Sequence, residues 1–216
     1  MRNGTLAQIG PWAGILHVVL AFTGFFIHWY PTMGASGPDL VAWTVATDPV
    51  RFATGVYIEA AGYVLLLVFA AWFWAVLQEA DPGARWLATA GLAALVGLVV
   101  VTLPLNEQWL AMLQGGKHGL DAVVMATLRD SIQYTFERSF LFAALFLATT
   151  AVVLLRAKAL PGWIGWSAAA LAVLILIPPA TILGGMAFTF WIPAVSAYAL
   201  IRRQHAPQPS PALAPA

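Results

Sequence analysis

The chain has 216 residues, of which 61% are hydrophobic and only 9% are charged, and its mean hydropathy is +0.83. Because about a quarter of the residues of a soluble domain are charged, this composition predicts an integral membrane protein whose partner is the lipid bilayer. A net charge of +1 without a basic cluster excludes nucleic acid as an expected partner, and the absence of cysteine excludes disulfides, thiol catalysis and thiolate metal sites.

Apolar segments long enough to cross a hydrocarbon core, which is about 30 Å thick and takes about 20 helical residues, occur six times. They cover approximately residues 11–30, 52–76, 85–105, 139–155, 163–183 and 184–201. The prediction is an all-α polytopic membrane helix bundle of about six transmembrane helices. It forms a single domain over residues 1–203 and ends in a disordered Pro/Ala-rich tail over 204–216. Pro178-Pro179 interrupts the last apolar region without a charge, so five or seven crossings, or a re-entrant pair, remain alternatives.

Three further features are expected at the outer ends of these spans. A short helix is predicted over residues 39–47, with the Asp39 carboxylate near its start, where it suits the helix dipole. Residues 106–114 have apolar side chains at helical spacing and are expected to lie flat on the membrane until Gly115-Gly116 breaks the helix. Residues 120–155 contain neither Gly nor Pro, which predicts one helix about 54 Å long that projects from the bilayer.

The basic residues predict the orientation of the bundle. Six crossings place one group on the first side of the membrane: Arg2, Arg85, Arg156, Lys158, Arg202 and Arg203. The other side receives fewer: Arg51, Lys117, Arg129 and Arg138. By the positive-inside tendency, both termini are expected to be cytoplasmic. Aromatic belts are expected to follow, with Trp29, Tyr30, Trp43 and Trp109 at the outer interface and Trp12, Trp86, Trp163 and Trp166 at the inner one.

Polar side chains gather at the outer ends of the first four predicted helices. The candidate ligand-binding residues are His28, Glu59, Tyr63, Asn106, Glu107, Tyr134, Glu137 and Arg138. An intramembrane carboxylate such as Glu59 needs a partner, and Arg138 is the nearest cation in predicted depth. One interpretation is a structural ion-pair cluster of Glu59, Glu137 and Arg138. The other is a pocket open to the outer leaflet that binds a lipid headgroup, a small molecule or a proton.

The sequence predicts neither a cofactor nor a metal site. His17 and His28 are separated by about 16 Å along one helix, so they cannot share a haem or a metal ion, and no H-x-x-x-H spacing occurs. His17 is expected to hydrogen-bond a neighbouring helix. Lys117 and Lys158 fall in predicted loops, which excludes a retinal linkage. If the chain is an enzyme, Glu59 is the best candidate for its acid or base.

Short motifs resemble a known group of proteins. They are Pro38-Asp39-Leu40-Val41-Ala42-Trp43, Gly55-Val56-Tyr57-Ile58-Glu59-Ala60-Ala61-Gly62, and Leu160-Pro161-Gly162-Trp163-Ile164-Gly165-Trp166 after Arg156. Together they resemble an uncharacterised family of actinobacterial multi-pass membrane proteins with about six helices. The resemblance implies this topology and a bacterial cytoplasmic (inner) membrane, but no activity. Thr102-Leu103-Pro104-Leu105-Asn106 is similar to the Pro-x-Asn turn of small anthrone-oxygenase-like membrane proteins, which keeps an enzyme among the alternatives.

Three functions follow from these observations. The first is a non-enzymatic membrane protein that binds a lipid or small amphiphile in a polar pocket near the outer leaflet. The alternative is a cofactor-independent intramembrane enzyme that acts on an apolar, isoprenoid-like or polyketide-like substrate. A small transporter ranks third, because the last two apolar segments offer few polar side chains for a path across the bilayer.

Overall fold

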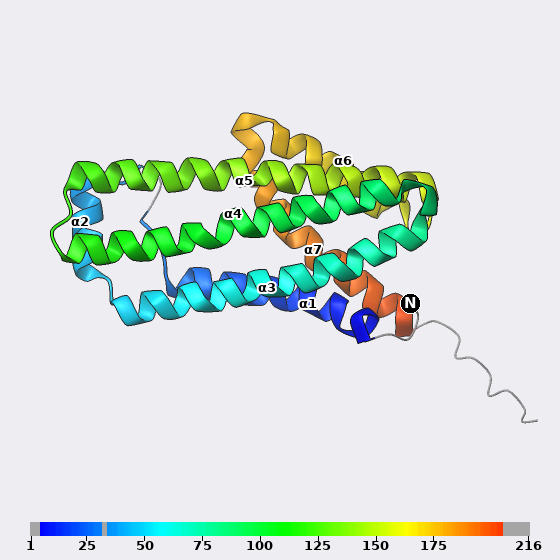
Figure 1. Cartoon of the computed structure of the whole chain (residues 1–216), viewed down its shortest axis with the longest axis horizontal. Coiled ribbons are helices and arrows are strands. Elements are labelled where there is room, and N and C mark those ends of the chain that lie inside the picture. The colour runs from blue at the N-terminus through cyan, green and yellow to red at the C-terminus, as the bar shows by residue number, and fades with distance from the viewer. Residues whose placement is uncertain (1–4, 32–33, 205–216) are drawn as a thin grey trace, which may run out of the picture.

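The computed structural model describes residues 5–31 and 34–204, and over these residues it is all-α. Its helices are α1 (Thr5–Ile27), α2 (Gly37–Ala46), α3 (Pro49–Ala80), α4 (Arg85–Lys117), α5 (Ala122–Ala157), α6 (Gly162–Leu176) and α7 (Thr181–Gln204) (Figure 1). Two short 3₁₀ helices, Pro82–Ala84 and Pro178–Ala180, precede α4 and α7. Gln204, predicted to begin the tail, ends α7, and the rest of the predicted tail lies outside the described residues.

Within residues 5–31 and 34–204, five helical segments are long and apolar enough to cross a membrane, which corrects the expected six and agrees with the alternative of five crossings. They are Thr5–Ile27, Pro49–Ala80, Pro82–Lys117, Ala122–Ala157 and Pro178–Gln204. The expected span over residues 163–183 is the one that falls short: α6 is apolar but has only 15 residues and is therefore about 22 Å long. It ends early because Pro178 and Pro179 lack the N–H groups that would continue the helix.

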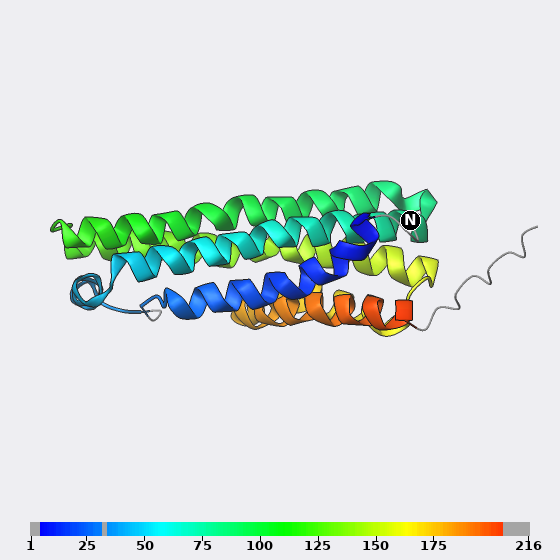
Figure 2. The ribbon, with the colours of Figure 1, turned by 90° about the horizontal axis from the view of Figure 1, so that it is seen from below.

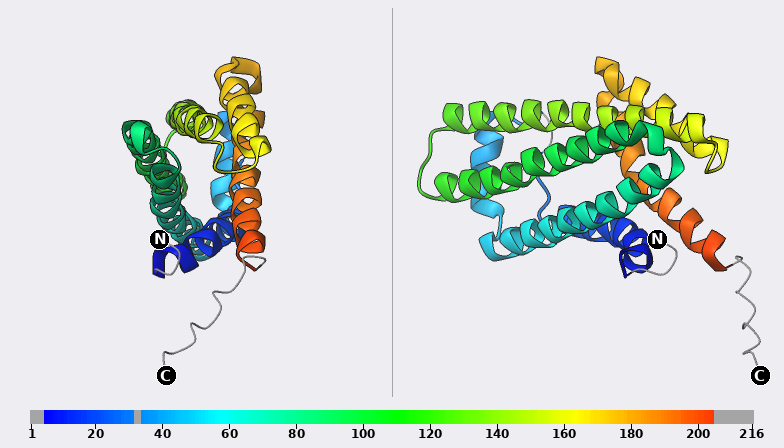
Figure 3. Two further views of the ribbon diagram at one scale, coloured as in Figure 1. Left: turned by 90° about the vertical axis from the view of Figure 1, so that its right-hand side faces the viewer. Right: turned by 45° about the vertical axis from the view of Figure 1, so that its right-hand side comes forward.

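The membrane helices surround a common interior. Helix α1 packs on α3 and α7, α3 on α4, α4 on α5, and α5 on α6, which returns to α7. Helices α1 and α3 run side by side over much of their length (Figure 2). The hairpin of α6 and α7 covers only part of the bundle's length, whereas α4 and α5 extend beyond it to the opposite end (Figure 3).

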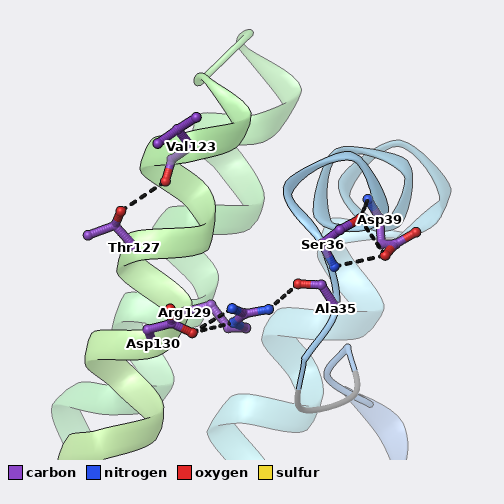
Figure 4. A network of polar contacts seen from close by, with 7 residues as sticks. All are labelled: Ala35, Ser36, Asp39, Val123, Thr127, Arg129 and Asp130. Carbon is purple, nitrogen blue, oxygen red and sulfur yellow. Dashed lines mark hydrogen bonds and ion pairs between the residues drawn. The ribbon is translucent and has the colours of Figure 1, made fainter.

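Helix α2 lies across the far ends of α4 and α5 and confirms the helix predicted over residues 39–47. It starts with a capping box, in which the side chains of Ser36 and Asp39 each accept from the other's backbone N–H. A Cβ on Gly116 would lie 2.5 Å from Thr44 Cγ2, so only glycine lets α2 sit this close to α4. Arg129 of α5 donates to the Ala35 carbonyl and ties the segment before α2 to the bundle (Figure 4).

The long helices α4 and α5 form one extended hairpin. Helix α5 has 36 residues without interruption, which confirms that this part of the chain forms one long helix. The segment expected to lie flat on the membrane instead continues α4 to Lys117, with Gly115-Gly116 inside the helix. Its apolar side chains are buried, because Trp109, Met112 and Leu113 pack in a second hydrophobic core under α2. That segment therefore belongs to the bundle and not to the membrane surface.

Two hydrophobic cores fill the interior. The larger lies within the membrane helices and includes Phe69, Phe73, Phe146, Phe188 and Trp191. The smaller, beneath α2, joins residues of α2, α3, α4 and α5. Members of both cores line the space between them, and this space holds the candidate site.

Candidate functional site

A cavity of about 410 Å³ lies between the two cores. Five membrane helices contribute to its wall: α1, α3, α4, α5 and α7. Most of the wall is aliphatic or aromatic, and its polar members are His17, Tyr30, Glu59, Tyr63, Thr102, Asn106, Gln133, Ser139 and Thr189. A volume of this size is within the range of about 300 to 1,000 Å³ that small-molecule sites occupy.

A chain of hydrogen bonds connects the polar groups at one part of this wall. His28 Nε2 lies 2.6 Å from Glu59 Oε2, and the Tyr30 hydroxyl lies 3.1 Å from the same imidazole nitrogen. The Tyr30 hydroxyl donates to Asn106 Oδ1 over 2.8 Å. The chain therefore joins the end of α1 and the residues after it to α3 and α4.

Two glycines bring His28 and Glu59 together. A Cβ on Gly24 would lie 2.6 Å from the Glu59 backbone nitrogen, and a Cβ on Gly55 would lie 2.7 Å from His28 Cβ. Because real Cβ atoms do not come this close to other atoms, glycine at both positions lets α1 and α3 approach at the depth of the pair. The ring of Phe52 packs against the His28 imidazole, with ring centroids 5.4 Å apart. His28 is thus held behind Glu59. Of these two residues, Glu59 lines the cavity and His28 does not.

Tyr63 and His17 extend the polar wall one turn deeper. Tyr63 lies within hydrogen-bonding reach of the Glu59 carboxylate, as the spacing of four residues on one helix predicts. His17 Nδ1 lies 2.9 Å from the Gly62 carbonyl of α3, which confirms His17 as a residue that hydrogen-bonds a neighbouring helix. Its ring also packs beside Tyr63, with centroids 5.8 Å apart, so His17 is both a helix contact and part of the wall.

Tyr30 and Asn106 complete the site at its end toward α2. Burial, and then the nearby Glu59 carboxylate, raise the pKa of Tyr30 well above its ordinary value, so its hydroxyl keeps the proton that it donates to Asn106. Asn106 is buried, and its Nδ2 group makes no hydrogen bond within the described part of the chain. An amide donor without a partner is costly inside a protein, and here it borders a cavity.

The structure brings together four of the eight predicted site residues: His28, Glu59, Tyr63 and Asn106. The other four do not line the cavity, since Glu107, Tyr134 and Arg138 are exposed and Glu137 is half-buried. Arg138, the expected partner of Glu59, lies outside the site, and His28 takes that role. Glu137 accepts a hydrogen bond of 2.7 Å from Gln133, which does reach the wall.

The direction in which each residue faces explains this division. Successive helical residues are rotated by about 100°, so Asn106 faces the cavity and Glu107 faces away. On α5 the spacing of Gln133, Phe136 and Phe140 places them on the inner face, and this turns Arg138 outward. The sequence placed Arg138 near Glu59, but Arg138 is exposed and lies outside the cavity wall.

The sequence assigned two of the site's aromatic residues to the wrong environment. Tyr30 and Trp109 were expected at the lipid interface, but they stack on each other inside the bundle with centroids 4.7 Å apart. Trp109 is only 7% exposed. Gln133 and Ser139, which also line the cavity, were not among the candidates, although Gln133, Phe136 and Phe140 have the spacing of one helix face.

Part of the cavity wall is formed by residues that are exposed on the bundle surface. Among the described residues that line the cavity, two are exposed: Trp29 at 56% and Met186 at 51%. Half-buried Phe22 and Ile182 lie beside them in the wall. From this exposure we infer that the cavity opens between the end of α1 and the start of α7.

No family model, curated protein or solved structure matches this chain. The resemblance to an actinobacterial family therefore stays a prediction. Composition, helix lengths and the arrangement of apolar helices nevertheless agree with one another. The chain is a multi-pass helical membrane protein with five candidate membrane spans and apolar helices embedded in a lipid bilayer.

Proposed function

We propose that the protein binds a small, mainly apolar molecule in the cavity between its two hydrophobic cores. The observation that supports this most directly is the cavity itself, whose volume is about 410 Å³ and whose apolar wall carries a few polar groups in one region. This combination is typical of small-molecule sites, in which apolar walls supply affinity and a few polar groups set the orientation. The cavity wall includes exposed Trp29 and Met186, which supports entry of a molecule dissolved in the bilayer at this part of the wall.

The charges around the cavity favour a neutral molecule over a phospholipid headgroup. Among the described residues that line it there is no Lys or Arg, and phosphate recognition depends on such cations. Glu59 would repel an anion, and its partner His28 lies behind the wall. Of the ligands that the sequence suggested, a small amphiphile therefore has more support than a lipid headgroup.

We place the protein in a bacterial inner membrane with both termini cytoplasmic. The α3–α4 and α5–α6 turns and the end of α7 lie at one end of the bundle, together with the start of α1. This end carries the basic residues Arg85, Arg156, Lys158, Arg202 and Arg203 and the exposed tryptophans Trp12, Trp86, Trp163 and Trp166. Positive charge with an aromatic belt is typical of a cytoplasmic interface. The cavity would then open toward the outer leaflet.

Native mass spectrometry of the detergent-purified protein tests the binding function. We expect a small molecule to co-purify with the wild-type chain and to be lost from Ala21→Phe, because Ala21 lines the cavity and a phenyl group would fill part of it. Ala61→Phe is the matched control, since Ala61 is exposed on α3 and outside the wall. Equal occupancy in both variants, or none in any form, would count against the cavity as a binding site.

A second candidate function is a cofactor-independent enzyme, and the pairing of Glu59 with buried His28 favours it. A carboxylate that faces a cavity can accept a proton from a bound molecule. The imidazole that is hydrogen-bonded to the carboxylate from behind holds it in position for this transfer. The co-purified molecule, once identified, would be incubated with fresh protein in deuterated water. Deuterium incorporation or isomerisation that requires Glu59 would support an enzyme, and an unchanged molecule would support binding alone.

A transporter has less support than either. The large hydrophobic core fills the bundle on the side of the cavity away from α2, where the ring of Phe73 contacts those of Phe69, Phe146 and Trp191. A polar path would have to cross this aromatic layer, and a solute would have to separate several packed rings. We therefore do not propose transport.

A further inference from the structure

We propose that the polar part of the cavity recognises one class of head group: a neutral hydroxyl or carbonyl oxygen carried by a flat, conjugated ring. This inference rests on the proposed binding function and specifies its ligand. Three observations carry it: the remaining acceptor capacity of Glu59, the unpartnered amide of Asn106, and the aromatic surfaces around both.

Glu59 supplies the acceptor. Its carboxylate lines the cavity and is already approached by His28 and Tyr63. A carboxylate offers about four lone-pair positions, so two partners leave acceptor capacity for a third group. An O–H of a ligand at this wall would donate to Glu59.

Asn106 supplies the donor. Its Oδ1 accepts from Tyr30, whereas Nδ2 makes no hydrogen bond within the described residues, although the side chain is buried. Asn106 borders the same cavity as Glu59 and belongs to the same hydrogen-bonded chain. A ligand oxygen beside it would satisfy the amide, and an apolar molecule would leave it unsatisfied.

The rings around these groups favour a flat molecule without charge. Tyr30 and Trp109 stack 4.7 Å apart, and Phe136 packs on Phe140 at 5.0 Å, and all four line the cavity. Aromatic walls give offset-stacked or edge contacts to a conjugated ring. They also attract cations, but Glu59 already has a potential cation in His28 at 2.6 Å, so an amine would compete with a partner built into the fold.

A matched set of small probes tests the head group: 1-naphthol, naphthalene and 1-naphthylmethylammonium. Their ring system is shared, and they differ in carrying a hydroxyl, no polar group or a cation. Affinity of each for the full chain would be measured by titration calorimetry at one fixed detergent concentration. The readout is the ratio of naphthol to naphthalene affinity, compared among variants so that partition into detergent cancels.

We expect this ratio to be about tenfold higher for the wild-type chain than for Asn106→Leu, because one hydrogen bond to a buried group is lost. Glu59→Gln should lower it by a smaller factor, since the neutral amide oxygen still accepts. Glu107→Gln is the control and should leave the ratio unchanged, because Glu107 is exposed and outside the wall. Asn106→Leu removes the acceptor of Tyr30, so the double variant Tyr30→Phe/Asn106→Leu repeats the measurement without a stranded hydroxyl.

The other outcomes separate this inference from the function on which it rests. If naphthol and naphthalene bind and no cavity variant changes their ratio, head-group recognition is wrong and the apolar binding site remains. If the ammonium probe binds most tightly and depends on Glu59, the ligand is a cation and the neutral class is wrong. If none of the probes binds the wild-type chain, both the inference and the proposed function fail.

Discussion

The imidazole of His28 and the carboxylate of Glu59 lie 2.6 Å apart, between residues separated by 31 positions in the sequence. Both residues are buried, with exposures of 1% and 8%. Inside a membrane protein, an ionisable group without a partner is costly, so each residue makes the burial of the other tolerable. This pair connects α1 to α3, and it fixes one wall of the cavity.

Removing His28 should destabilise the protein strongly. In His28→Ala the Glu59 carboxylate keeps its burial and loses its closest partner, and breaking a buried pair in this way costs about 3–5 kcal/mol. We expect a clear fall in the thermal unfolding temperature in detergent. Adding Glu59→Gln to His28→Ala should recover part of the loss, because the stranded group is then neutral. Additive losses in the double variant would contradict a direct interaction.

The close approach of α1 and α3 should depend on Gly24. An alanine Cβ at this position would lie 2.6 Å from backbone atoms of Glu59 and Gly55, which cannot move without shifting α3. We expect Gly24→Ala to destabilise the protein by about 1–3 kcal/mol, as overpacking usually does. Gly162→Ala is the matched control, because its Cβ would meet nothing closer than 3.9 Å. Similar unfolding temperatures for the two variants would show that the glycine contact is unimportant.

The opening of the cavity can be mapped by cysteine labelling, because the chain has no cysteine of its own. Met186 is exposed at the opening, and Leu183 is exposed on the same helix but outside the cavity wall. We expect a membrane-permeant maleimide to label both Met186→Cys and Leu183→Cys. Bound 1-naphthol should slow the labelling of the first and leave the second unchanged. Equal rates with and without naphthol at Met186→Cys would place the bound probe elsewhere.

Asp39 should make the stability of the α2 cap depend on pH. The hydroxyl and the backbone N–H of Ser36 both donate to its carboxylate and hold the pKa of this carboxyl group below its ordinary value. Because the folded pKa is depressed, the stabilisation is fully present above about pH 4 and is lost as the pH falls through the folded pKa. The stability difference between the wild-type chain and Asp39→Asn should therefore shrink below pH 4. In a Ser36→Ala background this pH dependence should be weaker, since the hydroxyl donor is gone.

Much of the fold followed from hydropathy and helix-breaking residues. Apolar composition predicted the membrane helices, and the lack of Gly and Pro over residues 120–155 predicted the long α5. The start of α2 was predicted from Asp39 and its surroundings. The same reasoning overestimated α6, because its apolar pattern continues past the prolines that end the helix. It also placed residues 106–114 on the membrane surface, since nothing local indicates that α2 covers them.

The sequence by itself determined the depth of each polar group, because helices rise by a fixed amount per residue and apolar segments mark the bilayer. His28, Glu59 and Asn106 were therefore expected near one level, and the tertiary structure joins them in one hydrogen-bonded chain. Only the tertiary structure decided which groups face each other. That depends on how each helix is rotated about its axis and on where glycines such as Gly24 let backbones approach. For this reason Glu59 meets His28, whereas Arg138 is exposed and outside the cavity wall.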